Sequence, residues 1–329
     1  MNTTPVIEVS ALTKDFKGLV AVDHISFTVE AGEIFGFLGP NGAGKTTTVR
    51  MLCTLTRPSS GRARVAGCDI TSQPNHVRRA IGIIFQDPSV DDRLTARENL
   101  RFHALVYKVP KIELKARIKQ ALDWMELGAR ADDLVRNFSG GMKRRLEIAR
   151  ALLHTPRVLF LDEPTLGLDP QTRNRIWERL LQLRQERKMT LFLTTHYMDE
   201  AEYCDRIAII DHGRIIALNT PANLKAQMKG DLVVLATSDN KQAVLEIESR
   251  YGLRAEMDRE KVWFTVAEGA LFVPKLVREL SVPVLSVAVR QPTLDDVFLK
   301  LTGREIRDED ASEREKLKSG LRRMGRGWR

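Results

Sequence analysis

Cysteine is scarce in this sequence, and long apolar runs are missing. The three cysteines, Cys53, Cys68 and Cys204, are scattered among 329 residues and form no CxxC pair. This spacing argues against a disulfide framework and a zinc site, and it suits a reducing compartment. No apolar stretch approaches 18 uninterrupted residues, so we expect no membrane-spanning helix. The first ten residues also lack the basic segment and apolar run of a secretory signal.

Acidic residues are fewer than basic ones. The 43 Asp and Glu residues face 52 Lys and Arg residues, which gives a formal charge of +9. Such an excess suits nucleic acid, an anionic membrane surface or simply solubility. Between residues 315 and 329 six basic residues accompany one acidic residue. We expect this segment to be a disordered, solvated tail, with attraction to anionic lipid headgroups as the alternative.

Apolar strands that alternate with helical patterns define the first part of the chain. Strands without a polar face are expected within 34–39, 81–86, 157–162 and 189–196, and residues 91–154 are mostly helical in pattern. Strands buried on both faces and alternating with helices predict a largely parallel α/β sheet. A hairpin is expected over 206–218, with His212 and Gly213 at its turn.

A change of pattern near Thr220 and Pro221 predicts a domain boundary. We expect a first domain over 1–221, with a helical subdomain at about 88–152. Beyond it, the order of strands and helices is βαββαβ, which is typical of a ferredoxin-like module. We therefore expect a small α+β domain over 222–302, with an accessory or regulatory role, and a polar, basic tail over 303–329.

A glycine-rich loop predicts a phosphate-binding site. The pattern G-x-x-x-x-G-K-[ST] is met between an apolar strand and a helix by Gly39, Pro40, Asn41, Gly42, Ala43, Gly44, Lys45 and Thr46, and Thr47 follows in the helix. The glycines allow a tight turn whose N–H groups point inward, at the positive end of the helix dipole. Lys45 would reach the β- and γ-phosphates, and the Thr46 hydroxyl would ligate Mg²⁺. The loop alone leaves kinase, GTPase and ATPase open.

Polar residues at the ends of other apolar strands predict hydrolytic chemistry. Asp162 ends one strand, where its carboxylate would meet the Mg²⁺ shell, and Glu163 follows it as a base for the attacking water. Gln86 and His196 end two further strands. Strand ends of an α/β sheet meet at one crevice, so we expect Gln86 to contact Mg²⁺ or the water and His196 to contact the γ-phosphate.

A second glycine turn opens another helix. Ser139 is a good N-cap, and Gly140 and Gly141 add N–H groups, so this turn is a second anion site. One chain needs only one nucleotide cradle, and the spare turn would serve the nucleotide of another molecule. The three basic residues that follow, Lys143, Arg144 and Arg145, are expected on a solvated helix face, with a binding patch as the alternative.

The ordered set of motifs resembles an ATP-binding cassette (ABC) ATPase over residues 5 to about 220. The resemblance implies a RecA-like P-loop core, an antiparallel β subdomain and a helical subdomain. It also implies a head-to-tail dimer that holds ATP between the Lys45 loop of one copy and the Ser139 turn of the other. Asp169, in the sequence Gly167-Leu168-Asp169, matches a loop that communicates across this dimer. Phe16 stands where the family usually stacks a Tyr on adenine, and Phe138 replaces a common Leu.

Longer stretches resemble the ATPases of daunorubicin-resistance exporters, which work with a separately encoded membrane permease. The resemblance implies an ATP- and Mg²⁺-dependent ATPase, most simply a homodimer, at the cytoplasmic face of the membrane, powering efflux of a drug-like or other hydrophobic substrate. The alternative is a cassette ATPase that acts on nucleic acid or ribosomes, motivated by the basic charge. Such proteins usually carry two cassettes or long coiled-coil inserts, so we expect no nucleic-acid partner. A P-loop kinase would leave the Ser139 turn without a use.

Overall fold

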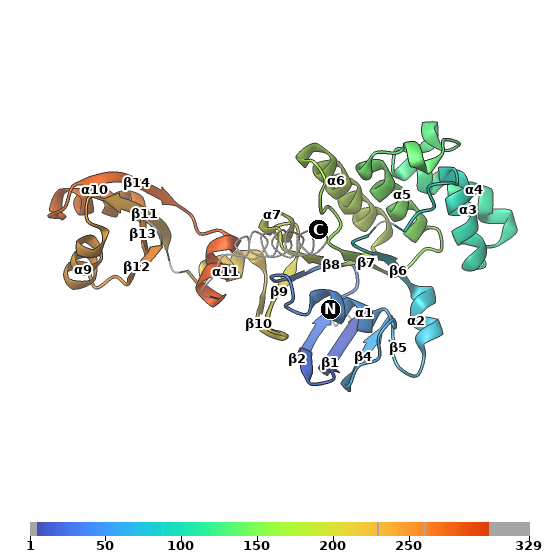
Figure 1. Cartoon of the computed structure of the whole chain (residues 1–329), viewed down its shortest axis with the longest axis horizontal. Helices are drawn as coiled ribbons and strands as arrows, with labels where there is room; N and C mark the ends of the chain where they lie inside the picture. Colours follow the sequence, from blue (N-terminus) through green and yellow to red (C-terminus); the bar gives the residue numbers. More distant parts are fainter. Residues whose placement is uncertain (1–4, 88, 229, 259–260, 303–329) are drawn as a thin grey trace, which may run out of the picture. The chain divides into compact units, whose positions relative to one another are not determined.

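The computed structural model describes residues 5–87, 89–228, 230–258 and 261–302 (Figure 1). The chain divides into two compact units, Met1–Leu218 and Asn219–Arg329. Among the described residues, every helix is too short or too polar to cross a bilayer. The predicted basic tail over 303–329 lies outside the described residues.

A six-stranded sheet forms the centre of the first unit and confirms the predicted α/β class. Its strand order is β10-β9-β3-β8-β7-β6, and the pairs from β9 to β6 are parallel. The strands are β3 (Ile34–Leu38), β6 (Ile81–Ile84), β7 (Val158–Asp162), β8 (Thr190–Thr195), β9 (Arg206–Asp211) and β10 (Arg214–Asn219). Every residue of β3, β7 and β8 is buried, as expected for the central strands of a sheet that is covered on both faces. The Phe192 ring lies 5.6 Å from that of Phe35 and 5.3 Å from that of Phe160, so aromatic side chains fill one face of the sheet.

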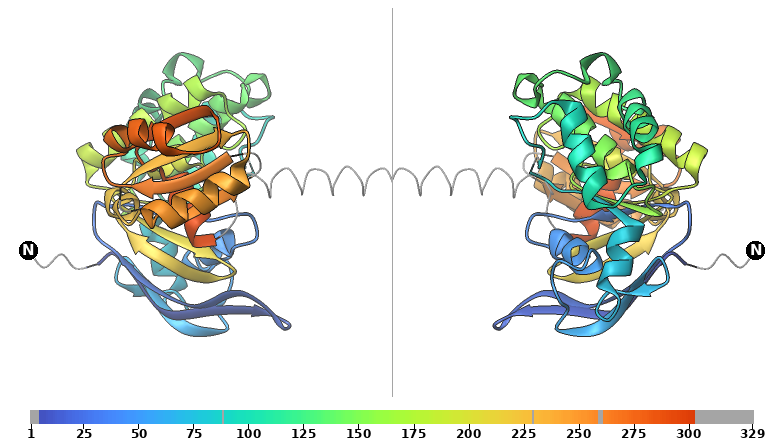
Figure 2. Two further views of the ribbon diagram at one scale, coloured as in Figure 1. Left: turned by 90° about the vertical axis from the view of Figure 1, so that its left-hand side faces the viewer. Right: turned by 90° about the vertical axis from the view of Figure 1, so that its right-hand side faces the viewer.

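An antiparallel sheet forms a second layer of this unit. Its strand order is β2-β1-β4-β5, with β1 (Ile7–Phe16), β2 (Leu19–Val29), β4 (Ser60–Val65) and β5 (Cys68–Asp69). In Figures 1 and 2 this blue sheet and the green helices lie on opposite sides of the central strands. The antiparallel subdomain and the helical subdomain of the family resemblance are therefore both present.

The helices of the first unit lie both between strands and in one continuous helical stretch from α3 to α5. They are α1 (Lys45–Leu52), α2 (Pro74–Ala80), α3 (Ala96–Val106), α4 (Lys111–Trp124), α5 (Gly140–Leu152), α6 (Pro170–Arg187) and α7 (Met198–Ala201), with short 3-10 turns at Gly128–Arg130 and Val135–Asn137. Helices α3, α4 and α5 pack against one another as the helical subdomain. Thr95 and Glu98 form a capping box that fixes the start of α3.

The second unit is a separate α+β module. It contains α8 (Pro221–Ala226), β11 (Asp231–Thr237), α9 (Asn240–Tyr251), β12 (Ala255–Asp258), β13 (Lys261–Val266), α10 (Gly269–Glu279), β14 (Val284–Arg290) and α11 (Leu294–Thr302). From β11 to β14 the order is βαββαβ, and the antiparallel sheet runs β12-β13-β11-β14. A hydrophobic core within this unit includes Val233, Leu235, Ile247 and Phe264.

Candidate functional site

The loop between β3 and α1 can form only with glycine at several positions. Gly42 and Gly44 have φ values of 79° and 104°, which side chains with a Cβ rarely adopt. A Cβ on Gly39 would lie 2.3 Å from the carbonyl oxygen of Ile210, and one on Gly44 would lie 2.5 Å from that of Ala21. The loop therefore packs its backbone against neighbouring strands, and α1 begins directly after it at Lys45.

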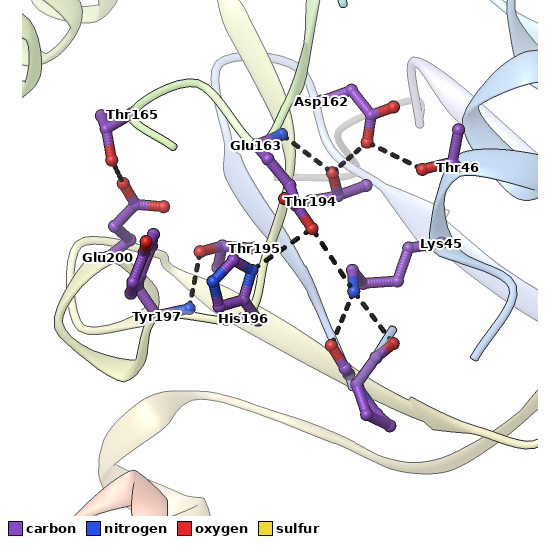
Figure 3. A network of polar contacts seen from close by, with 12 residues as sticks. Lys45, Thr46, Asp162, Glu163, Thr165, Thr194, Thr195, His196, Tyr197 and Glu200 are labelled. Carbon is purple, nitrogen blue, oxygen red and sulfur yellow. Dashed lines mark hydrogen bonds and ion pairs between the residues drawn. The ribbon is translucent and has the colours of Figure 1, made fainter. Parts of the chain in front are cut away.

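Lys45 is buried at the centre of the site. Its Nζ donates to the carbonyl oxygens of Gly39 at 2.7 Å and Pro40 at 3.0 Å. The same atom lies 3.6 Å from Oε1 of Glu163 (Figure 3). A buried ammonium is tolerated only with such partners. The loop thus presents a cation to whatever anion binds it.

Asp162 and Thr46 provide a pair of oxygens beside Lys45. Oδ1 of Asp162 accepts a hydrogen bond of 3.3 Å from the Thr46 hydroxyl and a second from the Thr194 hydroxyl. Burial raises the pKa of Asp162, although both hydroxyls counteract the shift. Among the described residues, no three His, Cys, Asp or Glu side chains gather as a metal site. Two protein oxygens still suit Mg²⁺, which takes its other ligands from phosphate and water.

Glu163 lies between two basic side chains. Its Oε1 is 3.3 Å from Nδ1 of His196, on the side opposite Lys45 (Figure 3). Its backbone N–H donates to both the carbonyl and the hydroxyl oxygen of Thr194, each at 3.1 Å. Burial would raise the pKa of Glu163, but His196 and Lys45 outweigh it and hold that pKa below its usual range. The carboxylate is therefore ionised and able to accept a proton.

The backbone around His196 is fixed by hydrogen bonds and ring contacts. The N–H of Tyr197 donates to the Thr195 hydroxyl at 2.9 Å, and the His196 and Tyr197 rings lie 4.1 Å apart. The Arg173 guanidinium lies 4.2 Å from the Tyr197 ring. Helix α6 therefore helps to fix the loop that carries His196.

The predicted second anion turn lies next to the start of α6. The Ser139 hydroxyl accepts from the N–H of Met142 at 3.3 Å and caps α5, as expected. A Cβ on Gly141 would lie 2.5 Å from Cγ2 of Thr172. Asp169 accepts from the N–H of Thr172 at 2.9 Å and caps α6. The Ser139 turn and the loop that carries Asp169 are thus side by side.

Gln86 and Phe16 are the two predicted site residues with exposed side chains at strand ends. Gln86 follows β6 by two residues and is exposed. Phe16 ends β1 with 48% of its surface accessible, and Nζ of Lys14 lies 4.8 Å from its ring centroid. Both side chains are accessible to a ligand, and their roles stay predictions.

The expected solvated face of α5 is wrong at Arg144. This side chain is buried, and its guanidinium donates to the backbone carbonyls of Asp162 at 3.2 Å and Glu163 at 2.9 Å. It also pairs with Glu147, which is wholly buried, at 3.1 Å. The sequence carried a signal, because Glu147 stands three residues after Arg144, at the spacing of an ion pair within one helix.

Lys143 and Arg145 also depart from that expectation, but less strongly. Lys143 pairs with Asp92 at 2.8 Å, and its side chain is 22% exposed. Arg145 donates to the carbonyl oxygen of Met125 at 3.0 Å, and its side chain is 16% exposed. Both therefore tie α5 to neighbouring segments instead of facing solvent freely.

The sequence around this site recurs in known proteins. The family pattern described as ABC transporter matches residues 22–166. A daunorubicin/doxorubicin resistance ATP-binding protein, DrrA of Streptomyces peucetius, is 40% identical over 331 residues, covering 96% of this chain and 100% of that protein. Nod factor export ATP-binding protein I of Ralstonia nicotianae is 39% identical over 312 residues, covering 94% and 97%.

A solved structure shares the arrangement of the first unit. The dimeric structure of an ATP-binding cassette in a post-hydrolysis state, bound to ADP and phosphate, is 27% identical to this chain with a TM-score of 0.60. The match covers 65% of this chain and 98% of that one. In that other protein, the same fold binds ADP and phosphate, the products of ATP hydrolysis.

Proposed function

The chain belongs to the ABC transporter family as an ATP-hydrolysing subunit of the exporter type, and from this premise we propose that two copies share each Mg-ATP site. The observation that carries the chemistry is the buried cluster in which Glu163 lies 3.6 Å from Nζ of Lys45 and 3.3 Å from Nδ1 of His196. This cluster joins a phosphate-binding lysine to a carboxylate base.

The residues of the cluster divide the work of hydrolysis. Lys45 and the N–H groups of its loop bind the β- and γ-phosphates, which would compete with Glu163 for the ammonium. Thr46 and Asp162 would hold Mg²⁺, which neutralises phosphate charge, and Gln86 would complete its shell or contact the water. Glu163 orients the attacking water and accepts its proton, while His196 donates to the γ-phosphate.

The Ser139 turn would complete the site of the partner copy. Helix α5 is long enough to present a dipole at its N-terminus, where the N–H groups of the exposed Gly140 and the partly exposed Gly141 would bind a phosphate. A Cβ on Gly140 would meet only Cδ2 of Leu168, at 3.9 Å. Within the described part of the chain, nothing is close enough to Gly140 to require glycine there. A phosphate of the partner's nucleotide, bound against this turn, would explain why position 140 has no side chain.

A mixing experiment tests the shared site. A Lys45→Ala chain and a Gly140→Asp chain are each expected to be inactive alone. In a hybrid dimer, one site would keep Lys45 and Gly140 together, and the other would lose both. Random mixing should therefore restore about a quarter of the wild-type sites, measured as ATP hydrolysis. Failure of mixed chains to recover activity, with hybrids present by tag pull-down, would contradict the shared site.

The partner whose transport is driven by ATP hydrolysis would be a separate membrane permease. Supporting this, α3 exposes apolar side chains on one side, with Phe102, Leu105 and Val106 at 66%, 52% and 62% exposure. Their spacing of three and four residues places them on one helical face, which suits a docked protein surface. Such docking would place the chain at the cytoplasmic face of the membrane.

The transported substrate would be drug-like or otherwise hydrophobic, which is supported by relatives named for daunorubicin/doxorubicin resistance and for Nod factor export. The alternative of an ATPase acting on nucleic acid receives no support from these relatives.

The site residues Phe16 and Asp169 would contact adenine and the partner copy, respectively. The second unit, from Asn219, would serve dimerisation or regulation.

A further inference from the structure

One guanidinium connects two strand ends to the helix that begins at the Ser139 turn. Nε of Arg144 donates to the carbonyl oxygen of Pro164 at 2.6 Å, and Nη2 donates to those of Glu163 and Asp162. Nη1 donates to the carbonyl oxygen of Phe85 and to Glu147. Arg144 therefore holds the backbone of the base Glu163 and the residue that precedes Gln86.

The next turns of α5 hold the other side of Gln86. Oε1 of Glu147 accepts from the N–H of Ser89 at 2.6 Å and from its hydroxyl at 3.1 Å. Arg150 donates to the carbonyl oxygen of Ser89 at 2.6 Å and to its hydroxyl. We call Arg144, Glu147 and Arg150 the α5 clamp. Its members are three residues apart along one helix and fix Phe85 and Ser89, on either side of Gln86.

Stability alone does not account for the α5 clamp. A buried ion pair replaced by apolar side chains of similar volume is often neutral or stabilising, because both charges lose water when they are buried. Here the polar atoms are directed at backbone groups that flank Glu163 and Gln86. The arrangement fits a demand for fixed geometry, which hydrolysis imposes on the base and on the water.

We propose that Arg144 and Glu147 are positioning residues, which make Glu163 and the Gln86 segment move together with α5. This inference rests on the proposed function, since α5 carries the turn that would bind the partner's nucleotide. The clamp holds the base and Gln86 in a fixed position relative to α5, so each site that has its own base and the partner's turn can hydrolyse ATP.

Arg144→Lys is the first test, because it keeps a charge beside Glu147 and removes the fork that reaches several carbonyls. We expect kcat for ATP to fall about tenfold or more, since a small displacement of a base is costly to turnover. KM for ATP should stay near the wild-type value, because the phosphate loop is untouched. The melting temperature should fall modestly, because several buried carbonyl oxygens lose their donor. Lys119→Gln, which removes an exposed pair with Asp123, is the matched control and should leave kcat unchanged.

The double variant Arg144→Met/Glu147→Leu separates positioning from stability. It removes the buried ion pair as a whole, so the protein should lose less stability than Glu147→Leu alone, and it should still show the reduced kcat. A folded double variant, or Arg144→Lys, with wild-type kcat would overturn the proposal. If the double variant does not fold, Arg144→Lys alone decides. Absence of ATPase activity in the wild-type chain would instead refute the proposed function.

Discussion

Glu163 is held by its backbone as well as by its side chain. Its φ of 49° lies in the left-handed region, which costs a residue with a Cβ about 1 kcal/mol or more. Two hydrogen bonds from its N–H to Thr194 and the carbonyl contact with Arg144 maintain this conformation. The surroundings therefore fix the position of Glu163 beside the phosphate loop.

Replacing Glu163 with Gln should separate binding from hydrolysis. The amide keeps the size of the side chain but is not a base, so we expect hydrolysis to fall by at least about 100-fold. ATP should still bind, and the protein should elute as a dimer when ATP and Mg²⁺ are present. Phosphate release and size-exclusion chromatography measure the two effects.

The control for this change is Glu178→Gln, an exposed acid on α6. It should hydrolyse ATP at the wild-type rate and show no ATP-dependent accumulation of dimer. A Glu163→Gln protein that matched the control in phosphate release would exclude Glu163 as the base.

The sequence predicts which residues surround Lys45 but not how they are held. Asp162, Glu163 and His196 follow apolar strands, and parallel strands end at one edge, so their meeting was predictable. Thr194 and Arg144 were not predicted. Their hydrogen bonds go to a neighbouring carboxylate or to backbone carbonyls, and such contacts depend on tertiary placement that no local pattern encodes.

At the level of elements, α3 is joined to the end of α5 through stacked rings. The Tyr107 ring lies 4.0 Å from that of His154 and 4.6 Å from that of His103. Burial, together with the charge of Arg150 and that of His154, lowers the pKa of His103 to about 3. His103 is therefore neutral in the folded protein throughout the physiological range.

This histidine should make the fold sensitive to acid. The unfolded chain binds a proton at His103 below pH 6.5, whereas the folded chain does so only near pH 3. Its contribution to the free energy of unfolding is thus lost as the pH falls from 6.5 toward 3. We expect His103→Leu to reduce the loss between pH 7 and pH 5 by about 1 to 2 kcal/mol.

Urea titrations at the two pH values measure this effect. His76→Leu, at an exposed position of α2, is the control and should leave the pH dependence unchanged. An identical pH dependence for His103→Leu and the wild type would show that His103 is not responsible.

Elements with an apolar centre were predictable, and those without one were not. Strands β3 and β7 are apolar at nearly every position, β8 has an apolar centre, and all three are fully buried, so their sequences identify them. Strand β5 has two residues, and α2 buries only Val77. Neither carries an apolar pattern of its own, so their neighbours decide their conformation.

At the scale of the whole molecule, the site residues and the α+β module belong to different units. All residues of the Lys45 cluster and the α5 clamp lie within Met1–Leu218, and the second unit has its own core. A chain that ends after Leu218 should therefore bind ATP with the wild-type affinity. Its dimerisation or its rate of hydrolysis should change, because we assign the second unit to one of these tasks.

Equilibrium ATP binding, sedimentation and phosphate release on this shortened chain test that assignment. Circular dichroism with the Lys45→Ala chain as the comparison checks that the first unit remains folded. Dimerisation and hydrolysis equal to those of the full chain would remove both assigned roles.

A side chain that donates hydrogen bonds to backbone carbonyl oxygens does not depend on which side chains those residues carry. The described hydrogen bonds of Arg144 to Phe85 and Pro164 go only to their carbonyl oxygens. Substitution of either side chain could therefore leave these hydrogen bonds intact. Glu147 is different, since its carboxylate balances the guanidinium. During divergence we therefore expect positions 144 and 147 to covary, while 85 and 164 drift independently of both.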